Sequence, residues 1–77
     1  MHDLQIMRKA NHSDINSIFG IEKDVFKEEN WSHNMIHSSI SDIATITYVI
    51  EEIENIVAYC MVKITDNVFE IINFAVA

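Results

Sequence analysis

The sequence contains a single glycine, no proline and a single cysteine. With so little glycine and proline and 49% hydrophobic residues, the chain has the composition of a packed globular domain and not that of a linker or a disordered tail. Because Cys60 has no second cysteine to pair with, an internal disulfide is excluded. A chain without disulfides fits a reducing compartment, so we expect a cytoplasmic protein.

Positive charge and long apolar runs are scarce as well. Five Lys and Arg stand against twelve Asp and Glu, which gives a formal net charge of -7. A surface of this sign repels a phosphate backbone, so we expect no nucleic-acid partner. The sequence has no run near the roughly 18 apolar residues that a membrane-spanning helix needs, and its first residues lack the apolar segment of a signal peptide. We therefore expect no membrane association.

Hydrophobic periodicity predicts two helices and four strands within one domain at most. Ser13 and Ser32 are of the residue type that caps helix N-termini, and Asp66 with Asn67 forms a two-residue turn typical of antiparallel hairpins. In chain order, the predicted segments are a strand at 3–9, helices at 14–25 and from Ser32 to about Ser41, and strands at 45–51, 56–65 and 68–77. The order β-α-α-β-β-β predicts an α+β fold whose last three strands form an antiparallel meander.

The last ten residues read VFEIINFAVA and are apolar except at Glu70 and Asn73. This pattern is typical of a strand that is covered on both faces, and the strand at 56–65 is apolar on both faces too. Two helices from one segment can cover only one face of the sheet. We therefore expect that the chain is the first half of a larger domain, or that a second copy supplies the missing layer.

Several short motifs in this order resemble a known family. They are Ile21-Glu22 followed by Phe26, Trp31-Ser32 at the start of the second helix, IVAY at 56–59 and INFAV at 72–76. Together they resemble the N-terminal half of the GNAT-superfamily N-acetyltransferases, and within that superfamily most of all the bacterial ribosomal-protein-alanine N-acetyltransferases. The resemblance spans residues 1–77 and implies a partial acetyltransferase domain, about half of the GNAT fold.

The resemblance implies a cofactor-binding role for Phe74, Ala75 and Val76. In this family the fourth strand splays from the fifth, and its unpaired backbone amides bind the pantetheine arm of acetyl-CoA. Backbone donors aimed at a developing oxyanion stabilise acyl transfer, and their side chains matter little beyond packing. The residues by themselves are equally compatible with an ordinary core strand.

Glu70 is the one charged residue in the last strand. A carboxylate buried between Phe69 and Ile71 would have a raised pKa, which suits a general base that takes a proton from an amine. The histone-acetyltransferase branch of the superfamily has its base at the matching position, so the resemblance to that branch implies Glu70 as a catalytic candidate. The resemblance to the ribosomal-protein-alanine branch instead implies catalytic residues further along, which are not among these 77 residues. The alternative is a solvated glutamate at a sheet edge or a hairpin end.

The chain also departs from the family pattern. The glycine-rich turn that holds the pyrophosphate of acetyl-CoA is expected within a few residues of Val76, and the sequence given ends at Ala77. Ala58 replaces a usual glycine, and Asn30 replaces a usual proline before the tryptophan. Without the amides of that turn, the main anion-binding device of the fold is missing.

Glutamate, tryptophan, histidine and cysteine provide further candidates for functional residues. Glu22 and Trp31 fall in the segment that resembles the substrate side of the family, although a tryptophan beside a helix cap is usually a packing anchor. His33 and His37 have a spacing that can hold a metal, but the sequence offers no third ligand, and we expect no metal site. Cys60 alternates with apolar residues and is expected to be a small core side chain.

These observations predict a fragment of an acetyl-CoA-dependent N-acetyltransferase that acts on a protein N-terminal α-amine and is inactive alone. The alternative is a small non-catalytic interaction module. Such a module would use its uncovered sheet face and last strand to form a homo-oligomer or to bind a separate C-terminal half.

Overall fold

The computed structural model describes residues 4–77, which form two α-helices, two short 3₁₀ helices and a four-stranded sheet. In chain order the elements are β1 (Gln5–Lys9), η1 (His12–Asp14), α1 (Ile15–Phe26), η2 (Lys27–Glu29), α2 (His33–Ser41), β2 (Thr45–Glu52), β3 (Asn55–Thr65) and β4 (Val68–Val76). The predicted α+β order is confirmed. Asp3, where the first strand was predicted to begin, lies outside the described residues.

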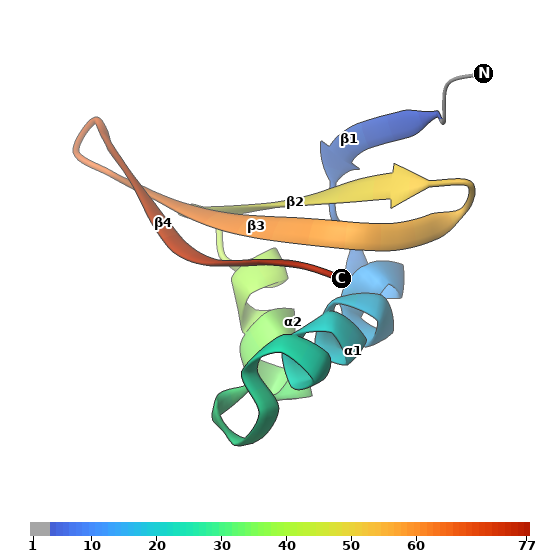
Figure 1. Ribbon diagram of the computed structural model, residues 1–77. Coiled ribbons are helices and arrows are strands. Elements are labelled where there is room, and N and C mark those ends of the chain that lie inside the picture. Colours follow the sequence, from blue (N-terminus) through green and yellow to red (C-terminus); the bar gives the residue numbers. More distant parts are fainter. Residues whose placement is uncertain (1–3) are drawn as a thin grey trace.

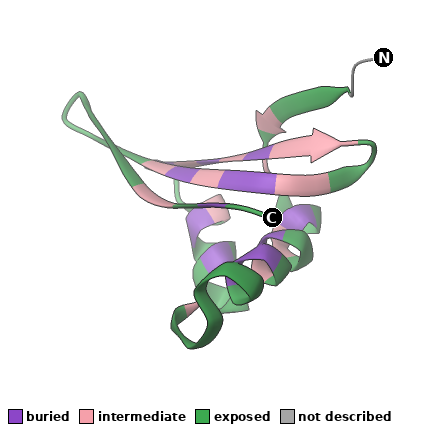
Figure 2. Ribbon diagram, in the orientation of Figure 1, coloured by how far each residue is buried: buried purple, intermediate pink, exposed green. Residues whose placement is uncertain are grey.

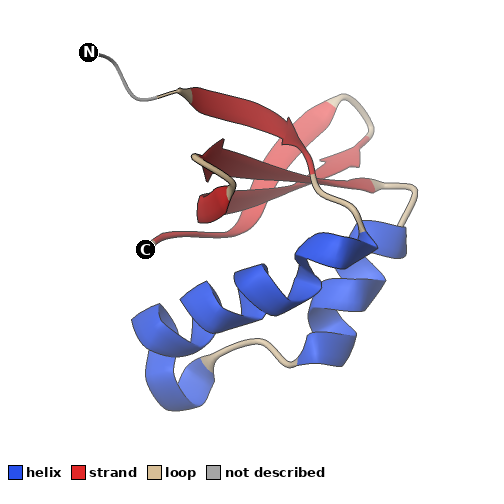
Figure 3. Cartoon of the chain, turned by 90° about the vertical axis from the view of Figure 1, so that its right-hand side faces the viewer, coloured by secondary structure: helices blue, strands red, loops and turns tan. Residues whose placement is uncertain are grey.

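The sheet has the order β1-β2-β3-β4, and all neighbouring strands are antiparallel. Both helices lie on one face, with α2 mainly beneath β2 and with α1 beneath β3 and β4 (Figures 1 and 3). No element within residues 4–77 covers the other face, which we call the open face (Figure 3). The strands β1 and β4 are the two edges of the sheet.

The start of α1 differs from the prediction that Ser13 caps it. Asn11 takes the capping role, because its side chain accepts a hydrogen bond from the Ser13 amide at 2.9 Å while Asp14 accepts one from the Asn11 amide at 2.9 Å. This reciprocal capping box opens η1, from which α1 continues. Ser32 caps α2 as predicted, since its Oγ accepts a hydrogen bond from the Met35 amide at 3.2 Å.

Both hairpins turn through residues with positive φ. Asp66 and Asn67 have φ values of 44° and 66° and form the predicted two-residue turn between β3 and β4. Between β2 and β3, the turn residues are Ile53 and Glu54, with φ values of 48° and 64°. A β-branched residue such as Ile53 rarely adopts this conformation.

The hydrophobic core lies between the helices and the sheet, where buried residues gather (Figure 2). The buried core side chains are Ile18, Ile21 and Ile36 from the helices and Val49, Tyr59, Met61 and Ala75 from the sheet. Burial of a side chain of the size of valine or isoleucine stabilises a fold by about 1.5–3 kcal/mol. Because the two helices cover only one face of the sheet, the core of residues 4–77 lies on that face alone.

The alternation in β2 is confirmed, and the side that faces the helices carries Thr45 and Thr47 as well as the core residue Val49. Thr45 and Thr47 are buried, and the Thr47 hydroxyl is 3.2 Å from the Ser39 hydroxyl of α2. The alternate apolar residues, among them Tyr48, point to the open face and are half-buried. Periodicity separates the two faces of a strand but does not say which face the helices cover.

The composition of β4 is typical of a strand that is covered on both faces. Within residues 4–77, only the face toward the helices is covered. Only Ala75 is buried, at 5% exposure, whereas Phe69, Phe74 and Val76 are 73%, 61% and 68% exposed. These large side chains belong to the open face together with Met7 of β1, which is 68% exposed. The open face of β4 therefore exposes apolar side chains that no segment within residues 4–77 buries.

Candidate functional site

The C-terminal half of β4 presents unpaired backbone groups at the edge of the sheet. The Ala77 amide donates to the Val57 carbonyl of β3 at 2.8 Å, and Ala75 is the register partner of Tyr59. Backbone groups alternate in direction along a strand, so the Ala75 amide also points to β3, while the amides of Phe74 and Val76 point outward. We call these two outward amides the β4 edge donors.

A β-bulge lies directly before the edge donors. Met61 pairs with Asn73 and Val62 pairs with Ile71, so Ile72 has no partner on β3. A bulge inserts one residue, bends the strand and increases its twist. In β4 it lets Ile72 pack against the core while Ile71 stays 62% exposed on the open face.

An open groove of about 450 Å³ lies beside the β4 edge donors. Its walls are Val25 and Phe26 at the end of α1 and the segment of β4 from Ile71 to Val76. The wall is largely apolar, and the backbone of β4 forms one side of it. A groove of this size, with amide donors along one wall, has the shape and chemistry to take an extended chain that carries carbonyl groups.

Four residues from four parts of the fold meet at a buried carboxylate on the helix side of β4. Glu22 of α1 has no exposed surface. Its Oε2 accepts a hydrogen bond from the Trp31 amide at 2.8 Å, and its Oε1 accepts hydrogen bonds from the Tyr59 hydroxyl and the Asn73 side-chain amide. We call Glu22, Trp31, Tyr59 and Asn73 the Glu22 cluster. It links α1, the segment before α2, β3 and β4.

The Glu22 cluster has a clear assignment of donors and acceptors. Burial, and then the hydrogen bond to the Glu22 carboxylate, raise the pKa of Tyr59 well above its ordinary range. The tyrosine therefore remains a protonated donor. Burying a carboxylate costs several kcal/mol of lost hydration, and hydrogen bonds to both oxygens offset part of that cost.

Glu70 lies in a different environment from the one on which its predicted role rested. It is exposed, it pairs in register with Lys63 of β3, and the flanking Phe69 and Ile71 are exposed as well. Within residues 4–77 nothing buries this carboxylate. The catalytic role of Glu70 stays a prediction and depends on residues that would cover β4.

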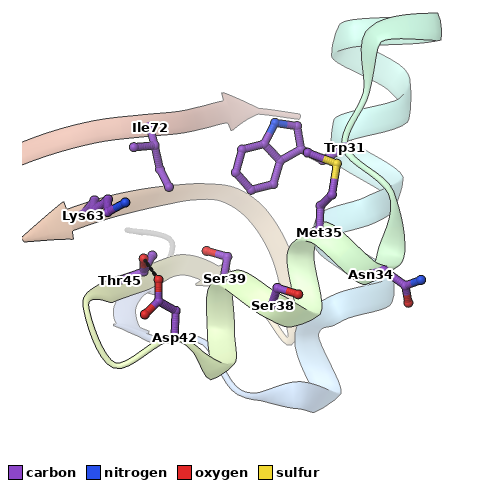
Figure 4. Close-up of a pocket in the computed structure, with 9 residues that line it drawn as sticks. All are labelled: Trp31, Asn34, Met35, Ser38, Ser39, Asp42, Thr45, Lys63 and Ile72. Atoms are coloured by element: carbon purple, nitrogen blue, oxygen red, sulfur yellow. Dashed lines mark hydrogen bonds between the residues drawn. The ribbon is translucent and has the colours of Figure 1, made fainter.

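A second pocket, of about 390 Å³, lies between α2 and the strands (Figure 4). Trp31 and Met35 lie at one end, and Lys63 and Asp42 at the other, while Asn34 points away (Figure 4). The Ala44 amide and the Thr45 hydroxyl donate to Asp42 and lower the pKa of its carboxyl. Asp42 therefore serves first to shape the turn after α2.

The sequence candidates His33, His37 and Cys60 each have different neighbours in the structure. His33 stacks on Phe19 with the ring centroids 3.9 Å apart, whereas His37 stacks on His12 at 4.7 Å. Cys60 is half-buried and lies on the open face. Among the described residues, no group of three His, Cys, Asp or Glu side chains could hold a metal ion, and no helix is long and apolar enough to span a membrane.

The Glu22 cluster is the part of the site that sequence reasoning missed. Glu22 lies four residues after the buried Ile18, on the face of α1 that points to the core, and Asn73 is the only uncharged polar residue of β4. A polar residue at a core position of each element is a signal that the two can meet. The separation of 51 residues between them gave no local hint of their pairing.

Two solved structures share the element order of this chain, and by this similarity its fold is that of the N-terminal half of a GNAT acetyltransferase. One similar solved structure is the ribosomal-protein-S18-alanine N-acetyltransferase from Escherichia coli, with a TM-score of 0.83 and 14% identity over 95% of this chain. Another is the GCN5-related glucosamine N-acetyltransferase region of a fungal multi-domain β-N-acetylglucosaminidase, with a TM-score of 0.77 and 14% identity over 100% of this chain.

Each match covers only part of the other protein. This chain spans 46% of the bacterial enzyme and 10% of the fungal protein. In sequence, no protein-family model and no curated protein matches the chain. The similarity therefore lies in the fold.

Proposed function

We propose that this chain provides the N-terminal half of an acetyl-CoA-dependent N-acetyltransferase that acts in the cytoplasm. The observation that carries the proposal is the pair of β4 edge donors beside a groove, in a fold shared with two N-acetyltransferase structures. In this role the amides of Phe74 and Val76 bind the pantetheine arm of acetyl-CoA. Ala75 contributes its buried side chain and its hydrogen bond to β3.

The residues present fit the binding of an acyl thioester. Acetyl-CoA supplies the acetyl group, and a carbonyl oxygen on it is an acceptor for an outward backbone amide. The amides of an edge strand need no movement to receive such an acceptor, because β3 does not use them. Fixed donors of this kind stabilise the negative charge that develops on a carbonyl oxygen during acyl transfer.

We further propose that the acceptor is a protein N-terminal α-amine, as in the ribosomal-protein-alanine type. Its support is the similarity in fold to the Escherichia coli enzyme. Glu70 is the candidate base by its resemblance to the histone-acetyltransferase branch, and in that role it takes the proton from the attacking amine once other residues cover β4. In a chain completed by the missing half, the variant Glu70→Gln is then expected to lower turnover by a factor of about 100 or more, and it should not lower the stability of the fold because the position is exposed.

The 77 residues alone are expected to show no turnover. Their only glycine, Gly20, lies in α1, so the glycine-rich turn that binds pyrophosphate is not among them. A chimera of residues 1–77 with the part of the Escherichia coli enzyme that follows the matched region supplies that turn. Acetyl transfer to an alanine-terminated peptide is expected from the chimera. Turnover by the 77 residues, or a folded chimera that binds no acetyl-CoA, contradicts the proposal.

A second candidate is the non-catalytic interaction module, and the open face favours it. Five large apolar side chains of β4 and β1 on this face are more than 60% exposed, namely Met7, Phe69, Ile71, Phe74 and Val76. A module of this kind is expected to form oligomers in solution, and Ile71→Lys on the open face should shift it to the monomer. A wild-type chain that stays monomeric at high concentration and binds no apolar dye contradicts the module.

A further inference from the structure

The Glu22 carboxylate has no cationic partner among the described residues, although it is fully buried. The basic residue Arg8 is engaged elsewhere, with Asp14 and Glu51. Replacing a buried charged group together with its partners by apolar side chains of similar volume often costs nothing or stabilises a fold. A buried, uncompensated carboxylate whose oxygens both accept hydrogen bonds therefore points to a requirement other than stability.

That requirement is visible in β4. The bulge at Ile72 interrupts the ladder, so the register of residues 73–76 is no longer fixed by residues 68–71. A slip by one residue would turn Phe74 toward the helices and reverse the direction of every amide after the bulge. Asn73 is the first residue after the bulge, and its side chain is bonded to Glu22.

We propose that Glu22 is a positioning residue that sets the register of β4 after the bulge and thereby aims the amides of Phe74 and Val76 outward. The inference rests on the proposed function, because it assigns to Glu22 the orientation of the groups that hold acetyl-CoA. The same carboxylate holds the Trp31 amide at 2.8 Å. Glu22 thus keeps the segment before α2 in a fixed position relative to the strand that binds the acyl donor.

Asn73→Ala tests the proposal with little risk to folding, because it removes one donor and leaves the Trp31 and Tyr59 hydrogen bonds. The expected result is that hydrogen exchange at the Ala75 amide, which points to β3, accelerates by a factor of about ten or more. Exchange at the Ile64 amide, which donates to the Ala44 carbonyl at 2.8 Å, should not change. Asn34→Ala, at an exposed position of α2, is the matched control and should change neither rate.

Glu22→Gln is the second variant. The side-chain nitrogen of glutamine is a donor and must face either the Trp31 amide or the Tyr59 and Asn73 donors, so the cluster cannot keep all three of its present hydrogen bonds. The expected result is weaker binding of acetyl-CoA, by a factor of about ten or more, read from the amide resonances of Phe74 and Val76. Asn73→Ala should weaken binding in the same way, and Asn34→Ala should not.

The outcomes separate the two proposals. Unchanged exchange at Ala75 in both variants, or equal acceleration at Ala75 and Ile64, overturns the positioning role. Faster exchange at Ala75 with undiminished acetyl-CoA binding also overturns it, because the cluster then has only a structural role. If the wild-type chain and the chimera bind no acetyl-CoA, the proposed function fails, and the exchange rates still decide whether Glu22 sets the register.

Discussion

The oxygens of Glu22 receive hydrogen bonds from parts of the chain that are far apart in sequence. Tyr59 and Asn73, which both donate to Oε1, lie 37 and 51 residues away. The Ser32 cap of α2, by contrast, bonds to an amide three residues ahead. Local motifs of this kind could be predicted because the chain itself sets their geometry, whereas the partners of Glu22 depend on how the whole sheet packs.

Removal of one donor from the Glu22 cluster should be costly. We predict that Tyr59→Phe lowers the free energy of unfolding by about 1.5–3 kcal/mol, because a hydrogen bond to a buried carboxylate is lost. Tyr48→Phe is the matched control, since Tyr48 lies half-buried on the open face, and it should change stability by less than about 0.5 kcal/mol. Chemical denaturation measures both, and equal effects would contradict the account.

A second residue-scale prediction concerns pH. The Arg8 guanidinium donates two hydrogen bonds to Asp14, at 2.8 and 2.9 Å, and holds the pKa of that carboxyl below its usual range. Because the folded-state pKa is lower than the unfolded one, the carboxylate stabilises the fold above about pH 4, and this contribution is lost as the pH falls. We predict that Asp14→Asn costs about 1–2 kcal/mol at neutral pH.

The pH dependence provides the control for Asp14→Asn. As the pH falls below about 4, the stabilities of wild type and variant should converge, because the wild-type carboxylate becomes protonated. Denaturation curves between neutral and acidic pH measure the difference directly. A difference that stays constant over this range would show that Asp14 acts through packing or capping alone.

At the scale of the element, β4 combines a paired side and a free side. Val76→Pro removes an amide that points away from β3, and proline is tolerated at such edge positions. We predict that this variant folds with a stability loss below about 1 kcal/mol and loses binding of acetyl-CoA. Ala75→Pro removes an amide that points to β3 and should cost about 3 kcal/mol or more. If Val76→Pro binds acetyl-CoA as well as wild type, the edge donors do not hold it.

The faces of the strands show where periodicity reaches its limit. Alternation in β2 was predictable, yet the helices cover its threonine side, because Thr47 finds a hydroxyl partner on Ser39. The apolar side, which includes Tyr48, belongs to the open face. A bulge also escapes prediction, since the residues around Ile72 give no sign that the ladder shifts there.

At the scale of the whole molecule, the chain is a one-sided sheet with a helix layer, and it spans 46% of the Escherichia coli enzyme it resembles in fold. The sequence indicated a missing layer, because the strands at 56–65 and 68–77 are apolar on both faces. Glu70 depends on the same cover, because its carboxylate is exposed within residues 4–77. The fold was therefore predictable, whereas the environment of its predicted base was not.

The central claim is that the outward amides of Phe74 and Val76 bind acetyl-CoA. Titration of the isotope-labelled 77-residue chain with acetyl-CoA, followed through its backbone amide resonances, tests this claim most directly. The account predicts that the amide signals of Phe74 and Val76 shift with increasing acetyl-CoA, while that of Ala75, which points to β3, shifts far less. Titration that leaves Phe74 and Val76 unmoved, or moves Ala75 as much, would contradict the account.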